Sequence, residues 1–143
     1  MRIPVSYVID ANVLLRFADP NSPQHGAVRR SVLSVGSINL FLAPQAMYEA
    51  WVVMTRPSSL NGFGWLPSKA HAILAGVRSQ FLFVPDPLNL VDEWLALCLQ
   101  HNVSGNPAHD ARLAAYAIAV GADGVLTLNP GDFRRFGITV LVP

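Results

Sequence analysis

Residues 109–133, HDARLAAYAIAVGADGVLTLNPGDF, contain the pattern that decides the fold of this 143-residue chain. An apolar stripe with helical spacing starts beside Asp110 and stops at Gly121, a residue that suits the end of a helix. An apolar, strand-like run at 124–128 follows, and Asp132 comes a few residues after it. A helix that leads directly into a buried strand is the unit from which parallel sheets are built.

The same alternation of strands and helices extends over the rest of the chain. Strands are predicted at 5–9, 38–42, 81–84, 124–128 and 138–142. Helices are predicted at 11–18, 24–35, 44–56, 67–80, 88–101 and 107–120, with Asn106 and Pro107 as cap and first residue of the last, and a short helical turn at 132–136. This order predicts a single α/β domain over residues 1–143, with a three-layer α/β/α structure and a parallel sheet of four or five strands.

Composition excludes several classes of protein. Hydrophobic residues make up 52% of the chain and charged residues only 13%, which argues against disorder. No apolar run approaches the ~18 residues of a membrane span, and the opening MRIPVSYVID lacks the long apolar core of a signal peptide. The single cysteine fits a reducing compartment, so we expect a cytoplasmic protein with no membrane partner. With a net charge of +1, any nucleic acid would have to be held by local contacts.

Most of the nine carboxylates have an ordinary structural explanation. Five are expected in turns or on the solvated face of a helix: Asp19, Asp86, Asp92, Glu93 and Asp123. Four remain as candidates for a functional site: Asp10, Glu49, Asp110 and Asp132.

The setting of each remaining carboxylate points to the same edge of the predicted sheet. Asp10 and Asp132 follow predicted strands, and ligands of open parallel sheets bind beyond the carboxyl ends of the strands. Glu49 is the only acid in an otherwise nearly apolar helix, so we expect it to be partly buried. Asp110 lies in the first turn of its helix, in line with the core-facing stripe.

Each of the four also has a structural interpretation. Asp10 and Asp132 would cap the helical turns beside them, and Asp110 would favour the positive end of its helix dipole. Glu49 would need an ion pair with an arginine, for which the candidates are Arg16, Arg56 and Arg112. Four carboxylates at one edge, however, would repel one another by a few kcal/mol at ~5 Å and would need a cation. Oxygen ligands alone favour Mg²⁺ or Mn²⁺ over zinc.

Three stretches together resemble a known family. YVIDANVLL (7–15) has an aspartate that closes the first strand, and QAMYEAWVVMTRP (45–57) has a helix with a central glutamate. HDARLAAYAIAVGADGVLTLNPGDF (109–133) has an aspartate-led helix and a Thr-x-Asn-x-x-Asp-Phe tail. In this order and spacing, along nearly the whole chain, they resemble the PIN domain and, within that family, the VapC-type toxins.

The resemblance implies a Mg²⁺-dependent endoribonuclease, with Mn²⁺ as a possible substitute, that hydrolyses RNA phosphodiester bonds. It also implies the toxin of a type II toxin–antitoxin pair, with a cognate antitoxin protein as partner and a homodimeric assembly. By position, Asp10, Glu49, Asp110 and Asp132 would form the catalytic and metal-binding acid cluster. Asn12, Thr127 and Asn129 would be its polar neighbours, Asn129 standing where many relatives have an aspartate.

RNA would be held by a few arginines, for which the candidates are Arg112, Arg134 and Arg135. Arg134 and Arg135 fit equally well as exposed residues at a helix end. His109, beside Asp110, is the one histidine that would lie near the site, although an exposed residue in the first turn of a helix is the commoner interpretation. Trp65 and Phe63 either stack on bases or pack on the core, and packing is the commoner outcome.

Two other functions compete with the ribonuclease. A catalytically weak PIN-like module that uses its cleft to bind protein remains open. A phosphoacceptor receiver domain also carries acids at strand ends, but it needs a lysine after its last strand, and the only lysine here is Lys69, in a helix.

Overall fold

The five strands of the structure form one parallel sheet, as the sequence predicts. The computed structural model describes residues 5–143; residues 1–4, on which the expectation about a leader segment partly rests, lie outside this range. The strands are β1 (Tyr7–Ile9), β2 (Leu40–Leu42), β3 (Leu82–Phe83), β4 (Gly124–Leu126) and β5 (Thr139–Leu141). Their order across the sheet is β3-β2-β1-β4-β5, and every neighbouring pair is parallel.

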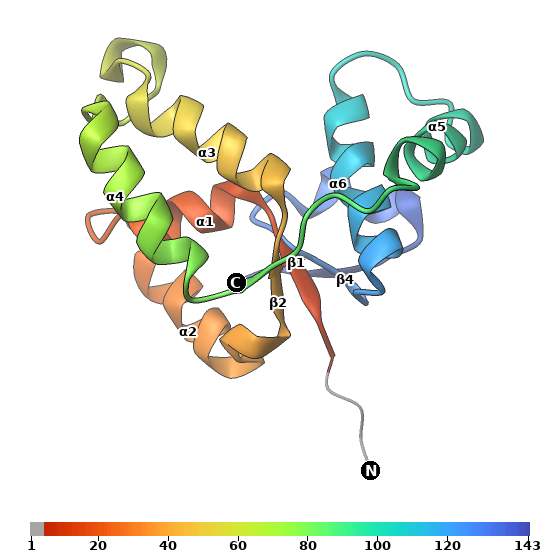
Figure 1. Ribbon diagram of the computed structural model, residues 1–143, viewed down its shortest axis with the longest axis horizontal. Coiled ribbons are helices and arrows are strands. Elements are labelled where there is room, and N and C mark those ends of the chain that lie inside the picture. Colours follow the sequence, from red (N-terminus) through yellow and green to blue (C-terminus); the bar gives the residue numbers. More distant parts are fainter. Residues whose placement is uncertain (1–4) are drawn as a thin grey trace.

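Helices cover both faces of this sheet and make it the middle of three layers (Figure 1). On one face lie α1 (Ala11–Ala18), α2 (His25–Val35), α3 (Pro44–Thr55) and α4 (Pro67–Arg78). On the other lie α5 (Leu90–Gln100) and α6 (Pro107–Val120). Each layer of helices has its own buried apolar cluster against the sheet, which confirms the predicted three-layer α/β/α architecture.

Several predicted boundaries are wrong by a few residues, and local hydrogen bonds explain the largest of these differences. The strand predicted at 38–42 begins as a 3₁₀ turn, Ser37–Asn39, because Asn39 bonds back to Gly36 and Val35. The short helix predicted at 132–136 is two 3₁₀ turns, Pro130–Asp132 and Arg134–Phe136.

The start and end of α6 test the predicted caps. Pro107 begins the helix as predicted, but the side chain of Asn106 makes no capping hydrogen bond. Gly121 ends the helix with a left-handed φ of 76°, which a glycine adopts without strain. Gly124 then starts β4, where an added Cβ would lie 1.8 Å from the carbonyl oxygen of Thr139. The close approach of β4 to β5 therefore requires glycine at this position.

The topology creates a single edge where a site can form. The chain leaves β1 for β2 on one side, while β4 joins β1 on the other, so β1 lies at the centre of the sheet. At such a reversal of strand order, the loops beyond the carboxyl ends diverge and leave a crevice. Because a helix that leads into a strand runs antiparallel to it, the start of α6 lies at the same edge as the end of β4. In the described part of the chain, no helix is long and apolar enough to span a membrane.

Candidate functional site

Asp10 lies where β1 ends and α1 begins, and the fold fixes both of its carboxylate oxygens. Its Oδ1 accepts a hydrogen bond from the backbone N–H of Ala11 at 2.8 Å, so the predicted capping role is correct. Its Oδ2 accepts from the Thr127 hydroxyl at 2.7 Å and from the Asn12 amide at 3.2 Å. One oxygen therefore caps the helix, while the other belongs to a polar cluster that crosses from β1 to the end of β4.

The polar neighbours of Asp10 also hold one another. The hydroxyl of the fully buried Thr127 accepts from the Asn12 amide at 3.4 Å and from the Asn129 backbone N–H at 3.0 Å. Asn12 Oδ1 accepts from the Leu128 backbone N–H at 3.1 Å. Asn129 thus joins this cluster through its backbone N–H, and Asn129 as a whole is exposed to solvent. The cluster ties the segment after β4 to the start of α1.

Each of the four candidate carboxylates is linked to at least one other through the effect of its charge. Burial raises the pKa of Asp10 to about 6, the hydrogen bonds from Thr127 and Ala11 oppose the rise, and the charges of Glu49 and Asp110 add to it. Burial also raises the pKa of Asp110 to about 6, with further contributions from the charges of Asp132 and Glu49. Asp10, Glu49 and Asp110 therefore lie near one another at this edge of the sheet, and Asp132 lies near Asp110.

Asp110 and Glu49 are half-buried, whereas Asp132 is exposed. Burial and the charges of Asp132 and Glu49 raise the pKa of Asp110, so these effects disfavour its charged form. Glu49 forms none of the three ion pairs considered for it; its carboxylate accepts a hydrogen bond from Gln45 Nε2 at 3.0 Å. Asp132 is the last residue of the 3₁₀ turn Pro130–Asp132.

This set of donors suits a hard divalent cation. No three His, Cys, Asp or Glu side chains within residues 5–143 stand close enough together to bind one metal ion as they are arranged. Mg²⁺, however, commonly takes only one or two protein carboxylates and completes its octahedron with water and substrate phosphate. Two carboxylates such as Asp10 and Asp110, both destabilised by burial and like charge, fit that mode of binding.

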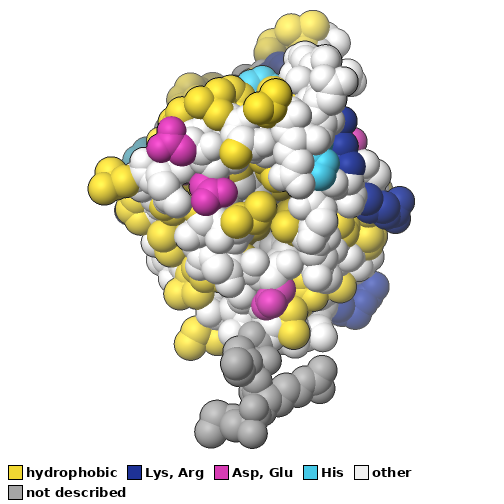
Figure 2. Space-filling view, turned by 90° about the vertical axis from the view of Figure 1, so that its right-hand side faces the viewer, with side chains coloured by type: hydrophobic (Ala, Val, Ile, Leu, Met, Phe, Trp, Pro, Cys, Tyr) yellow, Lys and Arg dark blue, Asp and Glu magenta, His cyan; other side chains and the backbone are white. Residues whose placement is uncertain are grey.

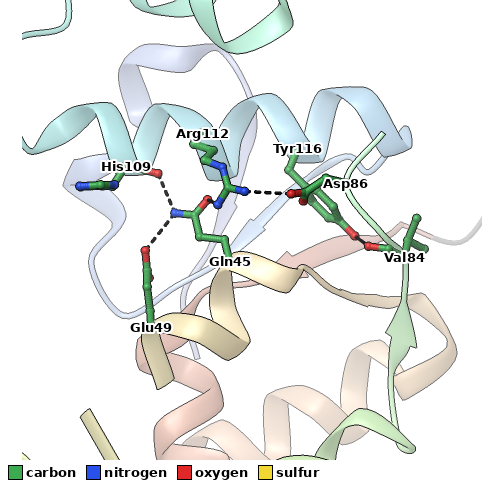
Figure 3. A network of polar contacts seen from close by, with 7 residues as sticks. All are labelled: Gln45, Glu49, Val84, Asp86, His109, Arg112 and Tyr116. Carbon is green, nitrogen blue, oxygen red and sulfur yellow. Dashed lines mark hydrogen bonds and ion pairs between the residues drawn. The ribbon is translucent and has the colours of Figure 1, made fainter. Parts of the chain in front are cut away.

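A second polar network lies beside the acids and joins α3, α6 and the segment after β3 (Figure 3). Arg112 forms an ion pair with Asp86 at 2.9 Å and donates to Gln45 Oε1 at 3.2 Å. Asp86, interpreted from the sequence as a turn residue, is thus the ionic partner of Arg112. The guanidinium of Arg112, which the sequence suggested as an RNA contact, is therefore bonded to Asp86 and Gln45 in this structure.

Sequence reasoning did not single out Gln45, one of two buried polar residues within the described range. Its amide donates to Glu49 Oε1 and, at 2.9 Å, to the backbone oxygen of His109. Its position four residues before Glu49 on the same helix was the available signal, because residues at this spacing are neighbours on a helix surface.

The other basic and aromatic candidates differ in their surroundings. Arg134 and Arg135 are exposed in the 3₁₀ turn Arg134–Phe136. Arg135 lies near Asp110, because its positive charge lowers the pKa of Asp110 and so opposes the rise caused by burial. The exposed His109 has the same effect. Phe63 and Trp65 pack on each other, with ring centroids 5.0 Å apart, and against the apolar cluster under α1–α4. The packing interpretation of these two aromatic residues is therefore correct.

Comparison with known proteins adds information on the fold. No family model matches the chain, and no curated protein matches it. Several solved structures do. The toxin VapC20 of Mycobacterium tuberculosis, described as cleaving the sarcin–ricin loop, is 15% identical, with a TM-score of 0.69 over 94% of this chain and 97% of its own.

Two further solved structures are similar to about the same degree. FitAcB of Neisseria gonorrhoeae is 18% identical, with a TM-score of 0.72 over 94% of this chain and 96% of that one. DNA-bound VapBC of Salmonella typhimurium is 15% identical, with a TM-score of 0.69 over 96% and 98%. At these identities the likeness concerns the fold, and it covers almost the whole of each chain. The chain thus adopts the PIN-domain fold of the VapC-type toxins.

Proposed function

We propose that this protein is a Mg²⁺-dependent endoribonuclease and the toxin of a type II toxin–antitoxin pair. The observation that carries the proposal is the position of Asp10, which is fixed at the carboxyl end of β1 by Thr127, Asn12 and Ala11 and lies close enough to Glu49 and Asp110 for their charges to raise its pKa. Bringing buried carboxylates close together costs free energy of folding. A bound divalent cation would offset this cost, and it would also attract a phosphodiester substrate.

The chemistry would divide among the residues according to their surroundings. Asp10 and Asp110 would hold Mg²⁺ or Mn²⁺, with Glu49 close to both and Asp132 close to Asp110. The ion supplies Lewis acidity for the attack of water on the phosphodiester and neutralises the charge that develops on its oxygens. Thr127 and Asn12 hold the Asp10 carboxylate in place, a role that raises the precision of a metal site.

The substrate would be guided by exposed arginines at the same edge. Arg134 and Arg135 are free to contact phosphates in this proposal, whereas Arg112 would first have to leave Asp86 and Gln45. The fork of a guanidinium matches the geometry of a phosphate group. With a net charge of +1, such local contacts would provide most of the attraction for RNA.

Apolar surfaces support the two proposed protein partners. A cavity of about 680 Å³ between α3, α4 and β3, lined by Met47, Tyr48, Trp51, Leu74 and Phe83 among others, would take an apolar segment of the antitoxin. A stripe of exposed side chains on α5 and just before it would pair with a second copy: Leu88, Val91, Leu95 and Leu99. Figure 2 shows the side of the molecule that carries α5 and α6, where hydrophobic side chains are spread over the surface with acidic side chains between them. In this proposal both partners meet the toxin in the cytoplasm.

The alternative is a catalytically weak PIN-like module that only binds protein, which the same apolar cavity would also suit. Purified protein and labelled RNA separate the two functions. We expect cleavage that stops with EDTA and returns with Mg²⁺ or Mn²⁺, and that Asp110→Ala abolishes. Asp92→Ala, which removes an exposed acid of α5 outside the cluster, is the matched control and should cleave normally. Cleavage that resists EDTA, or that survives in Asp110→Ala, would refute the proposed mechanism.

A further inference from the structure

Gln45 occupies a position that connects the acid cluster to the rest of the fold. It is 7% exposed, at the start of α3, with Glu49 one turn later on the same helix. Its side chain makes three hydrogen bonds to groups on two helices (Figure 3). Contacts to His109 and Arg112 link it to residues more than 60 positions away in the sequence.

The chemistry of these partners allows only one orientation of the amide. The NH₂ group faces two acceptors, Glu49 Oε1 at 3.0 Å and the His109 backbone oxygen at 2.9 Å. The carbonyl oxygen faces a donor, Arg112 Nη1, at 3.2 Å. A flipped amide would place oxygen against two oxygens and NH₂ against a guanidinium, so every contact would be repulsive.

The same contacts determine where two of the acids stand. His109 immediately precedes Asp110 in the first turn of α6, so the bond to its backbone oxygen holds the start of α6 against α3. The bond to Glu49 draws that carboxylate toward the same amide. Arg112, anchored by Asp86, holds the amide from its other end.

We propose that Gln45 is a positioning residue, which sets the separation of Glu49 and Asp110 so that the site can bind its divalent ion. This inference rests on the proposed function and adds to it a residue that does not touch the ion or the RNA. Gln45 acts through its two N–H groups, and the Asp86–Arg112 pair serves as its support. A shift of either carboxylate would weaken metal binding, since groups that orient metal ligands commonly affect affinity by about 10- to 100-fold.

Two substitutions separate positioning from packing. Gln45→Met keeps the length of an unbranched side chain and removes all three hydrogen bonds. Gln45→Glu keeps an acceptor for Arg112 but presents a carboxylate to Glu49 and to the His109 oxygen. Positioning of Glu49 predicts that Gln45→Glu is the more harmful change, whereas a merely structural link to Arg112 predicts the opposite order.

A matched control comes from the same neighbourhood. Tyr116 is buried on α6 and donates its hydroxyl to the Val84 backbone oxygen at 2.6 Å; its hydroxyl bonds to none of the four candidate acids, although the charge of Asp86 reaches it. Tyr116→Phe therefore removes one buried hydrogen bond near the network and leaves Gln45 untouched. It reports the effect of lost stability alone.

The readouts are Mn²⁺ affinity by calorimetry without RNA, kcat and KM for RNA cleavage, and melting temperature. We expect Gln45→Met to weaken Mn²⁺ binding about ten-fold and to lower kcat with little change in KM, with Gln45→Glu worse in both. Tyr116→Phe should lower the melting temperature while Mn²⁺ affinity stays at the wild-type value.

Two results would overturn the inference. The first is a Gln45→Met protein that matches Tyr116→Phe in Mn²⁺ affinity and kcat, which would reduce Gln45 to a structural contact. The second is a Gln45→Glu protein that binds Mn²⁺ better than Gln45→Met does. If Gln45→Met fails to fold, the inference is overturned by a Gln45→Glu protein that binds Mn²⁺ as tightly as the wild type. A wild-type protein that neither binds Mn²⁺ nor cleaves RNA refutes the proposed function itself, and this outcome is distinct from both.

Discussion

Asp10 and Asp132 are two of the four candidate acids, and their surroundings differ. Asp10 closes the central strand, and three hydrogen bonds from Ala11, Thr127 and Asn12 fix its two oxygens. Asp132 ends an exposed 3₁₀ turn and is linked to the cluster through the effect of its charge on Asp110. Hydrogen bonds thus hold the carboxylate of Asp10 in place, whereas Asp132 affects its neighbour Asp110 through its charge.

The largest expected effect tests this difference directly. Asp10→Ala should abolish RNA cleavage, with a loss of at least about 10³-fold, because it removes the proposed metal ligand that the fold holds in a fixed position. Asp132→Ala should retain measurable activity, with a loss of about ten-fold, because solvent and neighbouring side chains can replace an exposed carboxylate. Cleavage rates of both variants, with circular dichroism to confirm the fold, provide the measurement. Equal losses in the two variants would show that position within the cluster does not matter.

A smaller effect is expected from the residue that holds Asp10. Thr127→Val keeps the shape of the buried side chain but removes the hydroxyl that donates to Asp10 Oδ2. We expect cleavage and Mn²⁺ affinity to fall by about 10- to 100-fold, as for other groups that orient metal ligands. Thr55→Val is the matched control, because the Thr55 hydroxyl bonds only to the Trp51 backbone oxygen on α3. Similar losses in both variants would mean that Thr127 acts through stability.

The smallest expected effect concerns stability and its dependence on pH. Burial, together with the charges of Asp132 and Glu49, raises the pKa of Asp110 from 3.8 to about 6, so the native state holds this proton more tightly than the unfolded chain. The stability contributed by the protonated carboxyl is complete below pH 3.8 and is lost as the pH rises through about 6. Asp110→Asn should therefore stabilise the metal-free protein near neutral pH, by about 1 kcal/mol once solvent screening of this half-buried group is allowed for.

Urea unfolding in EDTA, at about pH 7.5 and about pH 3.5, measures this effect. The gain should be present at the higher pH and absent at the lower, where Asp110 is protonated in both states. A variant that is less stable than the wild type near neutral pH would mean that the Asp110 carboxylate is held by attraction rather than by repulsion.

Local patterns in the sequence were sufficient for most of the fold. The stripe of α6, its proline start and its glycine end are all local features, and the structure agrees with them at Pro107 and Gly121. The parallel sheet follows from the alternation of strands and helices. Strand ends were predicted less well: β1 begins at Tyr7 rather than at residue 5, and β4 ends at Leu126 rather than at residue 128, because pairing with neighbouring strands decides where a strand stops.

The sequence by itself determined the order of the elements and the four acids without an ordinary explanation, because helix and strand periods and turn chemistry act over a few residues. Only the tertiary structure decided that Arg112 pairs with Asp86, that Gln45 joins Glu49 to the start of α6, and that Thr127 holds Asp10. Apart from the neighbouring pair Gln45 and Glu49, these contacts join residues 26 to 117 positions apart. Such contacts depend on how whole layers pack, and no local period in the chain encodes them.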